Sequence, residues 1–564
     1  MGKLMKTVLV FVLVLAALLA LEALVQRFLP EREAEETVEA APTPAPEEPV
    51  IVNEMTPNSA TSIEFREDGV SLTGIGAETS DGVVTIRYPG TYRLSGSRTD
   101  GQLVVDLGDG HGGVYLLLDG LSLGCMDGPA VHVEQADLTV LYLEEGTQNA
   151  LWDGDGYVIQ EKSGTDKGAA VYSEDDLVLE GDGALALSGY AADGIRSKDG
   201  LTVNGGEISV WSIDDGLQGS DYVKLSGGVI TITSTGDGVT TRKGDITVDG
   251  AVLTVTADGD GLQSAADILV SAGSVTAATH GGADHYTEIG LSGVSAKGLK
   301  GMDITLTGGT VKLDTADDGL HAEGDLTISG AVCTVASGDD AFHAGGTLAA
   351  EDTSLYVTRS YEALEADTLR LTNAGVNAAA ENNGLSGGPG GVRLENVQVN
   401  LAAPRGVSTE GVLSLAGGCL TLYADGTDSL FAYGSLDLGE GALLALAETG
   451  RAETLLEKAA PAGGLLFVFN DPVPAGTEMT LGDASGEPVF TAVRTDADTG
   501  ALLLAGGDLE AGQSYTLTAG EREPVSLTAG EEWAVFEEPL PTPQPAGGFG
   551  GFPGGFGGPP GPWR

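Results

Sequence analysis

The chain has 564 residues, of which 87 are glycine, 41% are hydrophobic and only 5% are aromatic. A compact globule of this length would divide into several domains and use more aromatic residues, so the composition argues against that class. Acidic residues outnumber basic ones by 83 to 27, for a formal net charge of −56. This excess excludes an electrostatic grip on nucleic acid or on anionic lipid as the main function, and it is compatible with cation binding.

Residues 1–29 predict export. Lys3 and Lys6 precede an apolar run over residues 8–21, which Glu22 interrupts. A run of this length is typical of a signal peptide, and its extension past Glu22 is just long enough for a membrane-spanning signal-anchor. We expect one of these two, with the bulk of the chain outside the cell or at the cell surface. The Pro- and Glu-rich residues 30–50 predict a disordered linker.

Residues 191–450 repeat with a period of about 22 residues. Rungs begin at Asp193, Asp215, Asp237 and Asp260, with spacings of 22, 22 and 23 residues. Each rung contains two short runs that alternate apolar and polar residues, which predicts strands with one buried face, and a fixed repeat of such units predicts a solenoid. We therefore predict an all-β fold, a parallel β-helix, in which residues 280–295 form an insertion.

The flanking segments show related but less regular patterns. Residues 51–190 have the same short strands at a looser spacing, and we interpret them as the N-terminal cap and first rungs of the β-helix. Residues 459–530 change register and predict a small antiparallel, sandwich-like β-domain. Residues 539–564, rich in Gly, Pro and Phe, are predicted to be disordered.

The acidic residues at the rung starts are candidate metal ligands. Stacked rungs place equivalent residues about 4.8 Å apart, so these carboxylates would form a column of repelling charges. A hard cation between them would relieve the repulsion, and Ca²⁺ prefers carboxylate oxygens. The alternative is turn chemistry, with Asp-Gly forming a tight left-handed corner whose carboxylates cap backbone N–H groups. The candidate calcium ligands are Asp193, Asp214, Asp215, Asp237, Asp258, Asp260, Asp317, Asp318, Asp339, Asp340 and Glu362.

A second column lies three residues after each rung start, and by alternation it points outward. It is polar and varied, so it could form repeated hydrogen bonds with an extended polysaccharide, and its Lys and His residues could bind a uronate carboxylate. The alternative is an ordinary solvated face. Two His one rung apart could also bind a transition metal, but the sequence shows no third ligand. The candidate carbohydrate-binding residues, which include two possible stacking tyrosines, are Arg196, Gln218, Gln263, Tyr286, Lys297, Lys300, His321, His343, Tyr361 and Glu365.

Several motifs resemble the secreted bacterial family of carbohydrate-binding domain-containing proteins, over about residues 63–518. The motifs are GTYRLSG at Gly90–Gly96, DGIRSKD at Asp193–Asp199, SAKGLK at Ser295–Lys300, ADDGLHA at Ala316–Ala322, SYEALEA at Ser360–Ala366 and the Gly-Phe-rich tail. The resemblance implies a calcium-binding parallel β-helix that attaches to cellulose and to acidic, pectin-type polysaccharide. This chain lacks the long Gly/Ser/Trp-rich loop that often precedes the SAKGLK-like segment.

Three functions remain open from the sequence. The first is a non-catalytic, monomeric surface protein that binds polysaccharide (cellulose or a uronate-rich glycan), with Ca²⁺ as its cofactor and no catalytic residue. The second is a pectate-lyase-like enzyme in which Lys300, Lys297 or Arg196 abstracts a proton from a uronate; fold analogy alone does not establish this. The third is a structural spacer without a ligand.

Overall fold

The computed structural model describes residues 60–155, 157–161, 164–287, 293–424, 430–432, 435–447, 464–495, 497–530 and 533–537. The predicted leader 1–29, linker 30–50 and tail 539–564 lie outside these ranges. A search of the described residues for a helix of membrane-spanning length and hydropathy returns none.

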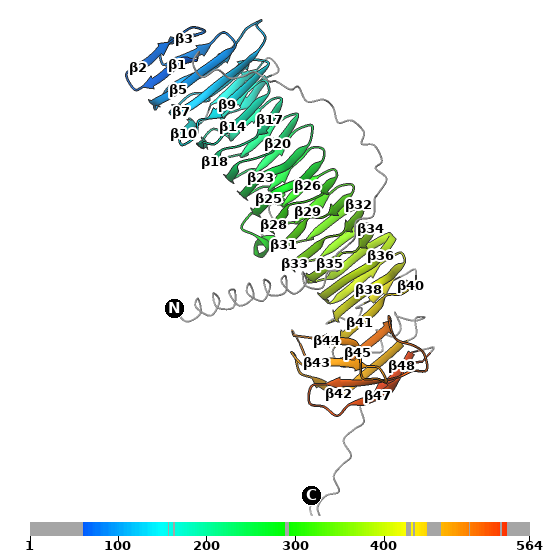
Figure 1. The fold of residues 1–564 in the computed structure, drawn as a ribbon. Helices are drawn as coiled ribbons and strands as arrows, with labels where there is room; N and C mark the ends of the chain where they lie inside the picture. Colours follow the sequence, from blue (N-terminus) through cyan, green and yellow to red (C-terminus); the bar gives the residue numbers. More distant parts are fainter. Residues whose placement is uncertain are drawn as a thin grey trace, which may run out of the picture. The chain divides into compact units, whose positions relative to one another are not determined.

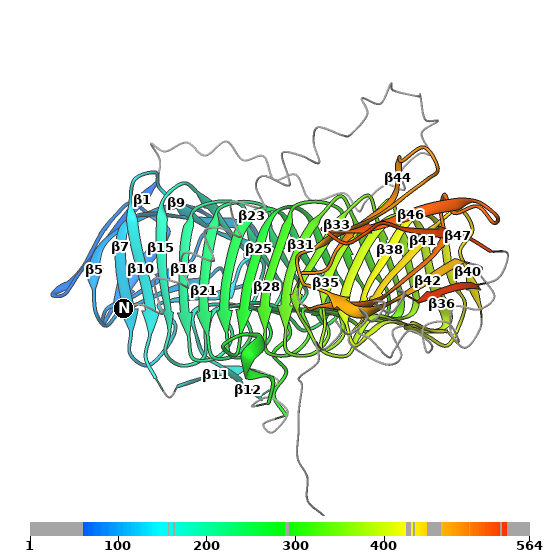
Figure 2. The same ribbon diagram turned by 90° about the horizontal axis from the view of Figure 1, so that it is seen from below.

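The described residues confirm the parallel β-helix (Figures 1 and 2). Each regular rung has three strands, one on each of three faces. In the first regular rung these are β16 (Asp193–Ser197) on the first face, β17 (Gly200–Val203) on the second and β18 (Glu207–Ser212) on the third. The next rung repeats them as β19 (Leu217–Gly219), β20 (Tyr222–Leu225) and β21 (Val229–Ser234). Each strand pairs in parallel with its counterpart in the following rung.

The strands of each face follow one another along the stack. The first face continues through β4 (Val83–Ile86), β6 (Gln102–Asp106), β8 (Val131–Gln135), β13 (Ala169–Ser173), β22 (Val239–Thr241), β24 (Leu262–Gln263), β26 (Leu299–Gly301), β29 (Leu320–Ala322), β37 (Arg405–Thr409) and β39 (Leu430–Ala432). The second face adds β1 (Thr61–Arg66), β9 (Leu138–Leu143), β14 (Leu177–Gly181), β27 (Ile304–Leu306), β30 (Leu326–Ser329) and β40 (Leu436–Asp437). The third face adds β10 (Gln148–Asp153), β15 (Ala184–Gly189), β28 (Thr310–Thr315), β31 (Val332–Ser337), β33 (Ser354–Arg359), β35 (Gly375–Ala379) and β41 (Ala442–Ala447). Long strands turn a corner and serve two or three faces: β5 (Gly90–Arg98), β7 (Gly113–Cys125), β23 (Ile246–Ala257), β25 (Ile268–Thr279), β32 (Phe342–Glu351), β34 (Leu364–Thr372), β36 (Asn383–Ala403) and β38 (Leu413–Ala424).

The interior is a stack of small and medium apolar side chains. Ile195, Leu217, Val239 and Leu262 succeed one another on the first face and have no exposed surface. This confirms the core predicted from alternation. The expectation of two strands per rung was wrong, because the first-face strand of a regular rung has only two to five residues and carries no visible alternating run.

The glycine of each Asp-Gly pair is explained by close packing instead of a left-handed corner. A Cβ on Gly216 would lie 2.4 Å from Ile232 Cγ2 and 2.5 Å from the Gly238 carbonyl oxygen. Positive φ occurs instead at the corner between the second and third faces, for example at Gly206 and Gly228. The alternative interpretation of Asp-Gly as a left-handed turn is therefore wrong for the backbone, since only space requires this glycine.

Both ends of the helix carry antiparallel structure, which removes open sheet edges. At the N-terminal end, β2 (Gly69–Thr73) pairs with β1, and β3 (Ala77–Ser80) pairs with β4. At the C-terminal end, β41 pairs antiparallel with β45 (Thr499–Gly506), which also pairs with β42 (Gly464–Val473). The strands that complete this region are β43 (Glu478–Gly482), β44 (Pro488–Val493), β46 (Ser514–Ala519), β47 (Val525–Thr528) and β48 (Trp533–Glu537). Four of them form the small antiparallel sheet β44-β43-β46-β47.

Two segments project from the rungs, at the lower edge of Figure 2. One is the hairpin of β11 (Val158–Glu161) and β12 (Gly164–Lys167), which the sequence analysis did not anticipate. The other is the described part of the predicted insertion, which contains a 3₁₀ turn, η2 (Ala283–His285). The insertion is fastened to the rungs by a hydrogen bond from Ala283 N to Asp314 Oδ1 (2.9 Å) and by an ion pair between Asp284 and Arg359.

Candidate functional site

The acidic rung starts form a hydrogen-bonded column, which we call the aspartate ladder: Asp193, Asp215, Asp237, Asp260, Asp318 and Asp340. The backbone N–H of Asp215 donates to Oδ1 of Asp193 (3.1 Å), and the N–H of Asp237 donates to Oδ1 of Asp215 (2.9 Å). In the same way, the N–H of Asp260 donates to Oδ1 of Asp237 (2.8 Å). With Asp260, which accepts from Lys297 N, and Asp318, which accepts from Asp340 N, five ladder carboxylates cap the backbone of the next rung, as the turn-chemistry alternative expected.

The second oxygen of each ladder carboxylate binds the outward column. In Asp193, Oδ2 accepts from Arg196 Nε at 2.6 Å. In Asp237 it accepts from Gln263 Nε2 at 2.8 Å, and in Asp260 it lies 3.4 Å from Lys300 Nζ. The two columns treated separately in the sequence are thus one network on the first face.

The outward column has the register expected from the repeat, but its exposure varies along the stack. Successive strands pair Arg196 with Gln218, Lys300 with His321, and His321 with His343. Arg196 is 1% exposed and Gln218 is 3% exposed, so the expectation of a solvent-facing column was wrong at this end. Only the part from Gln263 onward is open to solvent.

The hairpin β11–β12 lies over the first face near the buried end. Ile159 of the hairpin clusters with Ala169 and Tyr172, and Tyr157 packs against them. Tyr172 pairs in register with Arg196 on the next rung. A sequence-local hairpin therefore covers the start of the column, an effect that alternation along a strand cannot predict.

Burial and charge shift the titration of the ladder in opposite directions at different rungs. Burial raises the pKa of Asp193 to about 7, against the opposing charge of Arg196. Burial and the charges of Asp260 and Asp215 raise the pKa of Asp237 to about 7. Burial would also raise the pKa of Asp318, but hydrogen bonds from His321 and Lys297 outweigh it and hold that pKa at about 2.

At the open end, His343 lies between two carboxylates. Its Nδ1 is 3.2 Å from Asp340 Oδ2 and 3.2 Å from Glu365 Oε2. Its ring stacks on that of His321, with centroids 4.6 Å apart and planes 6° from parallel. Hydrogen bonds to Asp340 and Glu365 raise the pKa of His343 to about 10, which favours its protonated form at neutral pH, while burial raises the pKa of Asp340 to about 8. Asp340, His343 and Glu365 each bring a donor atom within 4.8 Å of the others, a convergence that the sequence did not reveal.

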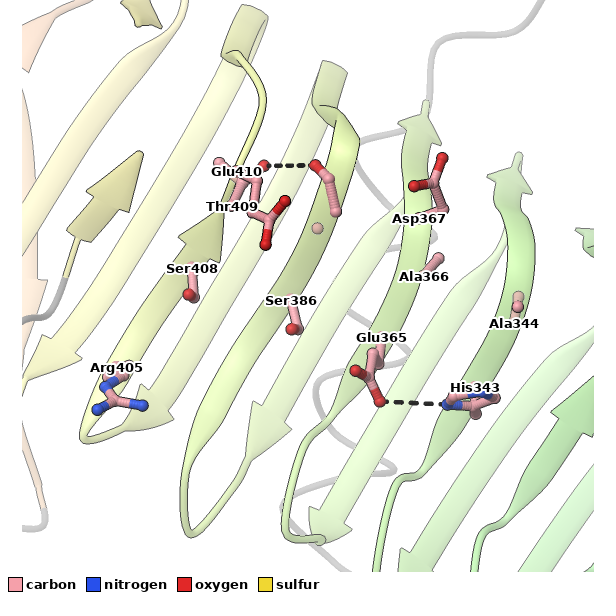
Figure 3. A pocket seen from close by; sticks show the side chains of 13 residues that line it. His343, Ala344, Glu365, Ala366, Asp367, Ser386, Arg405, Ser408, Thr409 and Glu410 are labelled. Atoms are coloured by element: carbon pink, nitrogen blue, oxygen red, sulfur yellow. Dashed lines mark hydrogen bonds and ion pairs between the residues drawn. The ribbon is translucent and has the colours of Figure 1, made fainter. Parts of the chain in front are cut away.

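A pocket of about 570 Å³ opens beside His343 and Glu365 (Figure 3). Arg405 lines it from β37, two rungs beyond Glu365. Ser386 lies on the strand between them and pairs with Glu365, and Ser408 lies on β37 and pairs with Ser386. The sequence analysis named only His343 and Glu365 of these residues. The repeat itself could have found Ser386 and Ser408, because they continue the outward column at the same register, whereas Arg405 pairs with Asn383 outside that column.

The residues Asp317, Asp318 and Asp339 have the donor set that calcium prefers. Their carboxylate oxygens lie within 4.8 Å of one another, and all are hard oxygen donors. Lys297 Nζ lies 3.1 Å from Asp317 Oδ1 and 2.5 Å from Asp318 Oδ2, so a protein cation already neutralises part of this charge. The donor chemistry fits calcium, which would share or displace the position of the ammonium group.

The two predicted stacking tyrosines meet at Asp339. The hydroxyl of Tyr286 donates to Asp339 Oδ2 (3.2 Å), and the backbone N–H of Tyr361 donates to the Asp339 carbonyl (2.8 Å). Both side chains are exposed, at 39% and 45%.

The other predicted acidic ligands are spread over different environments. Asp214 and Asp258 lie at the corner just before the ladder, and Asp258 is exposed. Glu362 continues the ladder, where its Oε1 accepts from the amides of Asn382 (2.8 Å) and Asn383 (2.7 Å).

A second acidic ladder, missed in the sequence, occupies the corner between the first and second faces. It consists of Asp245, Asp267, Asp303 and Asp325, all of them exposed or partly exposed. Oδ1 of Asp245 accepts from Asp267 N (3.1 Å), and Oδ1 of Asp303 accepts from Asp325 N (2.8 Å). Capping of backbone N–H groups by aspartate is therefore a general device of this helix.

Comparison with known proteins agrees with the resemblance in the rung motifs. A family model described as carbohydrate-binding domain-containing protein matches residues 80–341. A carbohydrate-binding domain-containing protein of Acetivibrio thermocellus is 31% identical over 149 residues, which are 26% of this chain and 52% of the relative. The chain thus spans about half the length of that relative.

One solved structure is also similar, that of the polysaccharide lyase-like protein from C. thermocellum as a gadolinium derivative. It is 28% identical, with a TM-score of 0.38, over 39% of this chain and 92% of that one. The family model and the Acetivibrio thermocellus relative confirm the resemblance to the carbohydrate-binding domain-containing family, with the family match extending over residues 80–341.

Proposed function

We propose that this protein is a non-catalytic, extracellular carbohydrate-binding protein that takes a uronate-containing polysaccharide at the open end of the first face. The observation that carries the proposal is the pocket between His343 and Arg405, in a chain whose family is described as carbohydrate-binding. The pocket combines the cationic groups of His343 and Arg405, which would bind a uronate carboxylate, with hydroxyls and three carboxylates, which would bind its ring hydroxyls.

Each part of the pocket has a partner on a uronate ring. Arg405 offers a planar guanidinium that binds a carboxylate through two parallel hydrogen bonds. His343 adds a second positive charge, because its pKa of about 10 keeps it protonated. Ser408 and Glu365 provide a hydroxyl and a carboxylate for the ring hydroxyls.

Calcium is part of the proposal because the chain is strongly acidic. A net charge of −56 repels a polyuronate at long range. An ion held by Asp317, Asp318 and Asp339 would lower this repulsion close to His343, beside the hydroxyl of Tyr286.

The geometry favours binding over lyase chemistry. Burial would lower the pKa of Lys297, but the charges of Asp318 and Asp317 raise it above its usual value, which disfavours the free amine that a base needs. Arg196 is buried in its pair with Asp193. Lys300 Nζ lies 3.0 Å from Gln263 Oε1 and 3.4 Å from Asp260 Oδ2, so it too is engaged in the network.

The test is calorimetric titration with oligogalacturonate in 2 parallel conditions, with calcium and with EDTA. Arg405→Gln and His343→Gln are each expected to weaken binding by roughly tenfold or more, the loss typical of a charged hydrogen bond. Arg393→Gln is the matched control, because Arg393 is exposed on β36 and lies outside the pocket. Equal affinity of Arg405→Gln and the unaltered chain would overturn the proposed site.

A further inference from the structure

A row of aromatic residues lies on the third face, a different face of the β-helix from that of the aspartate ladder. Trp152 on β10 pairs in register with Ser188 on β15, which pairs with Trp211 on β18. These strands lie side by side in Figure 2. Tyr190 follows β15, and its ring centroid is 5.2 Å from that of Trp211 at a tilt of 52°. Tyr190 is 45% exposed and Trp211 is 41% exposed.

A trough of small residues runs beside these rings. Ser122, Ala150, Ala186 and Ser209 occupy successive outward positions of the third face. Two hollows of about 450 Å³ and about 390 Å³ lie over this trough and share Ala150 and Ala186. The shared lining makes them two parts of one groove.

The aromatic wall of the groove is held in place by its neighbours. A Cβ on Gly124 would lie 2.1 Å from the Nε1 atom of Trp152, so the indole rests directly on the glycine of the preceding rung. Ser188 leaves space between Trp152 and Trp211, because its side chain is small. A wall that is fixed before a ligand arrives loses little conformational entropy on binding.

The polar groups of the groove indicate the class of ligand. Gln148 and Glu207 line one hollow, and Asp153 and Asp155 line the other. None of the described residues that line the two hollows is Lys or Arg. Amide and carboxylate groups bind sugar hydroxyls, and a lining without a cationic partner for a uronate carboxylate favours a neutral sugar.

The spacing of the rings suits a short run of sugar units. Trp152 and Trp211 are two strands apart, roughly 10 Å at the usual strand spacing. Aromatic rings offer flat apolar faces with polar edges, to which the C–H face of a pyranose ring is complementary. We propose that this groove, lined by Trp152 and Tyr190 and extended by Trp211 beside Tyr190, is a second glycan-binding site that takes a neutral, hexopyranose-based polysaccharide.

The site is separate from the one in the proposed function, so either can fail alone. The probe is cellohexaose, a neutral oligosaccharide, titrated into the full chain while tryptophan fluorescence and heat are recorded. Of the four tryptophans of the chain, Trp152 lines the groove and Trp211 packs against Tyr190 of its wall, so binding is expected to change the emission. Trp211→Ala and Tyr190→Ala are each expected to weaken binding at least tenfold, while Trp211→Phe retains most of it.

Tyr222→Ala is the matched control, because Tyr222 is a similarly exposed aromatic on the second face, at 39%. It is expected to leave the affinity for cellohexaose unchanged, as is Arg405→Gln. Thermal unfolding checks that each variant is folded, and Trp211→Phe keeps the test valid if the alanine variant is not. The proposal is overturned if the unaltered chain binds no cellohexaose, or if Trp211→Ala binds it as tightly as the control.

Discussion

Arg196 Nε lies 2.6 Å from Asp193 Oδ2, and the two side chains are 1% and 0% exposed. A buried ion pair of this kind contributes little net stability compared with apolar residues, but the loss of one partner leaves a charge buried alone. The pair is buried one rung from Tyr172 of the hairpin cluster, so solvent cannot replace the missing partner.

Arg196→Met is therefore expected to lower the free energy of unfolding by about 3–5 kcal/mol. Urea denaturation at pH 8 measures it. Arg393→Met, at an exposed position, is expected to change stability by less than about 0.5 kcal/mol. If the double variant Asp193→Asn/Arg196→Met regains stability, the loss in Arg196→Met is due to the unpaired charge of Asp193. A small effect of Arg196→Met alone would contradict the prediction.

Asp237 predicts a pH dependence of stability. Its pKa rises from 3.8 to about 7 on folding, so the folded state holds a proton that the unfolded state has already lost. The free energy of unfolding is thus expected to fall as the pH rises from 4 through 7. Asp237→Asn cannot ionise, and at pH 8 it should be more stable than the unaltered chain by about 1–2 kcal/mol.

The comparison with a second substitution separates charge from capping. Asp237→Ala removes the acceptor for the N–H of Asp260 and is expected to destabilise the fold at both pH 4 and pH 8. Chemical denaturation at the two pH values measures both variants. An Asn variant that is less stable than the unaltered chain at pH 8 would show that the carboxylate is needed in its charged form.

Calcium is expected to stabilise the chain through Asp317, Asp318 and Asp339. An ion at one hundred times its dissociation constant adds about 2.7 kcal/mol to the free energy of unfolding, provided that it binds only the folded state. Calorimetric melting in calcium and in EDTA measures the difference. Asp317→Asn/Asp339→Asn should abolish it, whereas Asp303→Asn in the exposed second ladder should leave it intact. Identical melts in calcium and EDTA would rule out this ion.

Gly216 predicts a steric limit on the Asp-Gly pair. Gly216→Ala would place a methyl group 2.4 Å from Ile232 Cγ2 and should cost about 1–3 kcal/mol, the usual range for overpacking. Gly375→Ala is the control, because its Cβ would meet nothing closer than 3.8 Å. Thermal unfolding compares the two, and equal melting temperatures would contradict the packing account.

The sequence predicted the parts of the structure that depend on local periodicity. The core file of Ile195, Leu217 and Val239 follows from alternation and from the 22-residue repeat. The covered state of Arg196 does not, because the hairpin that lies near it is a separate insertion without the repeat. The neighbourhood of Trp152 and Trp211 could not be predicted from the repeat either. The rungs before Asp193 are irregularly spaced, so only the strand pairing of the structure shows that these residues are neighbours.

The aspartate ladder gives the stack a direction. The N–H of Asp215 is completed by a carboxylate of the rung before it, and the N–H of Asp237 by the carboxylate of Asp215. When the chain is synthesised from its N-terminus, the carboxylate that accepts each new rung's N–H is therefore already present in the rung before it. The direction of these hydrogen bonds thus favours addition of rungs in the order in which they are synthesised.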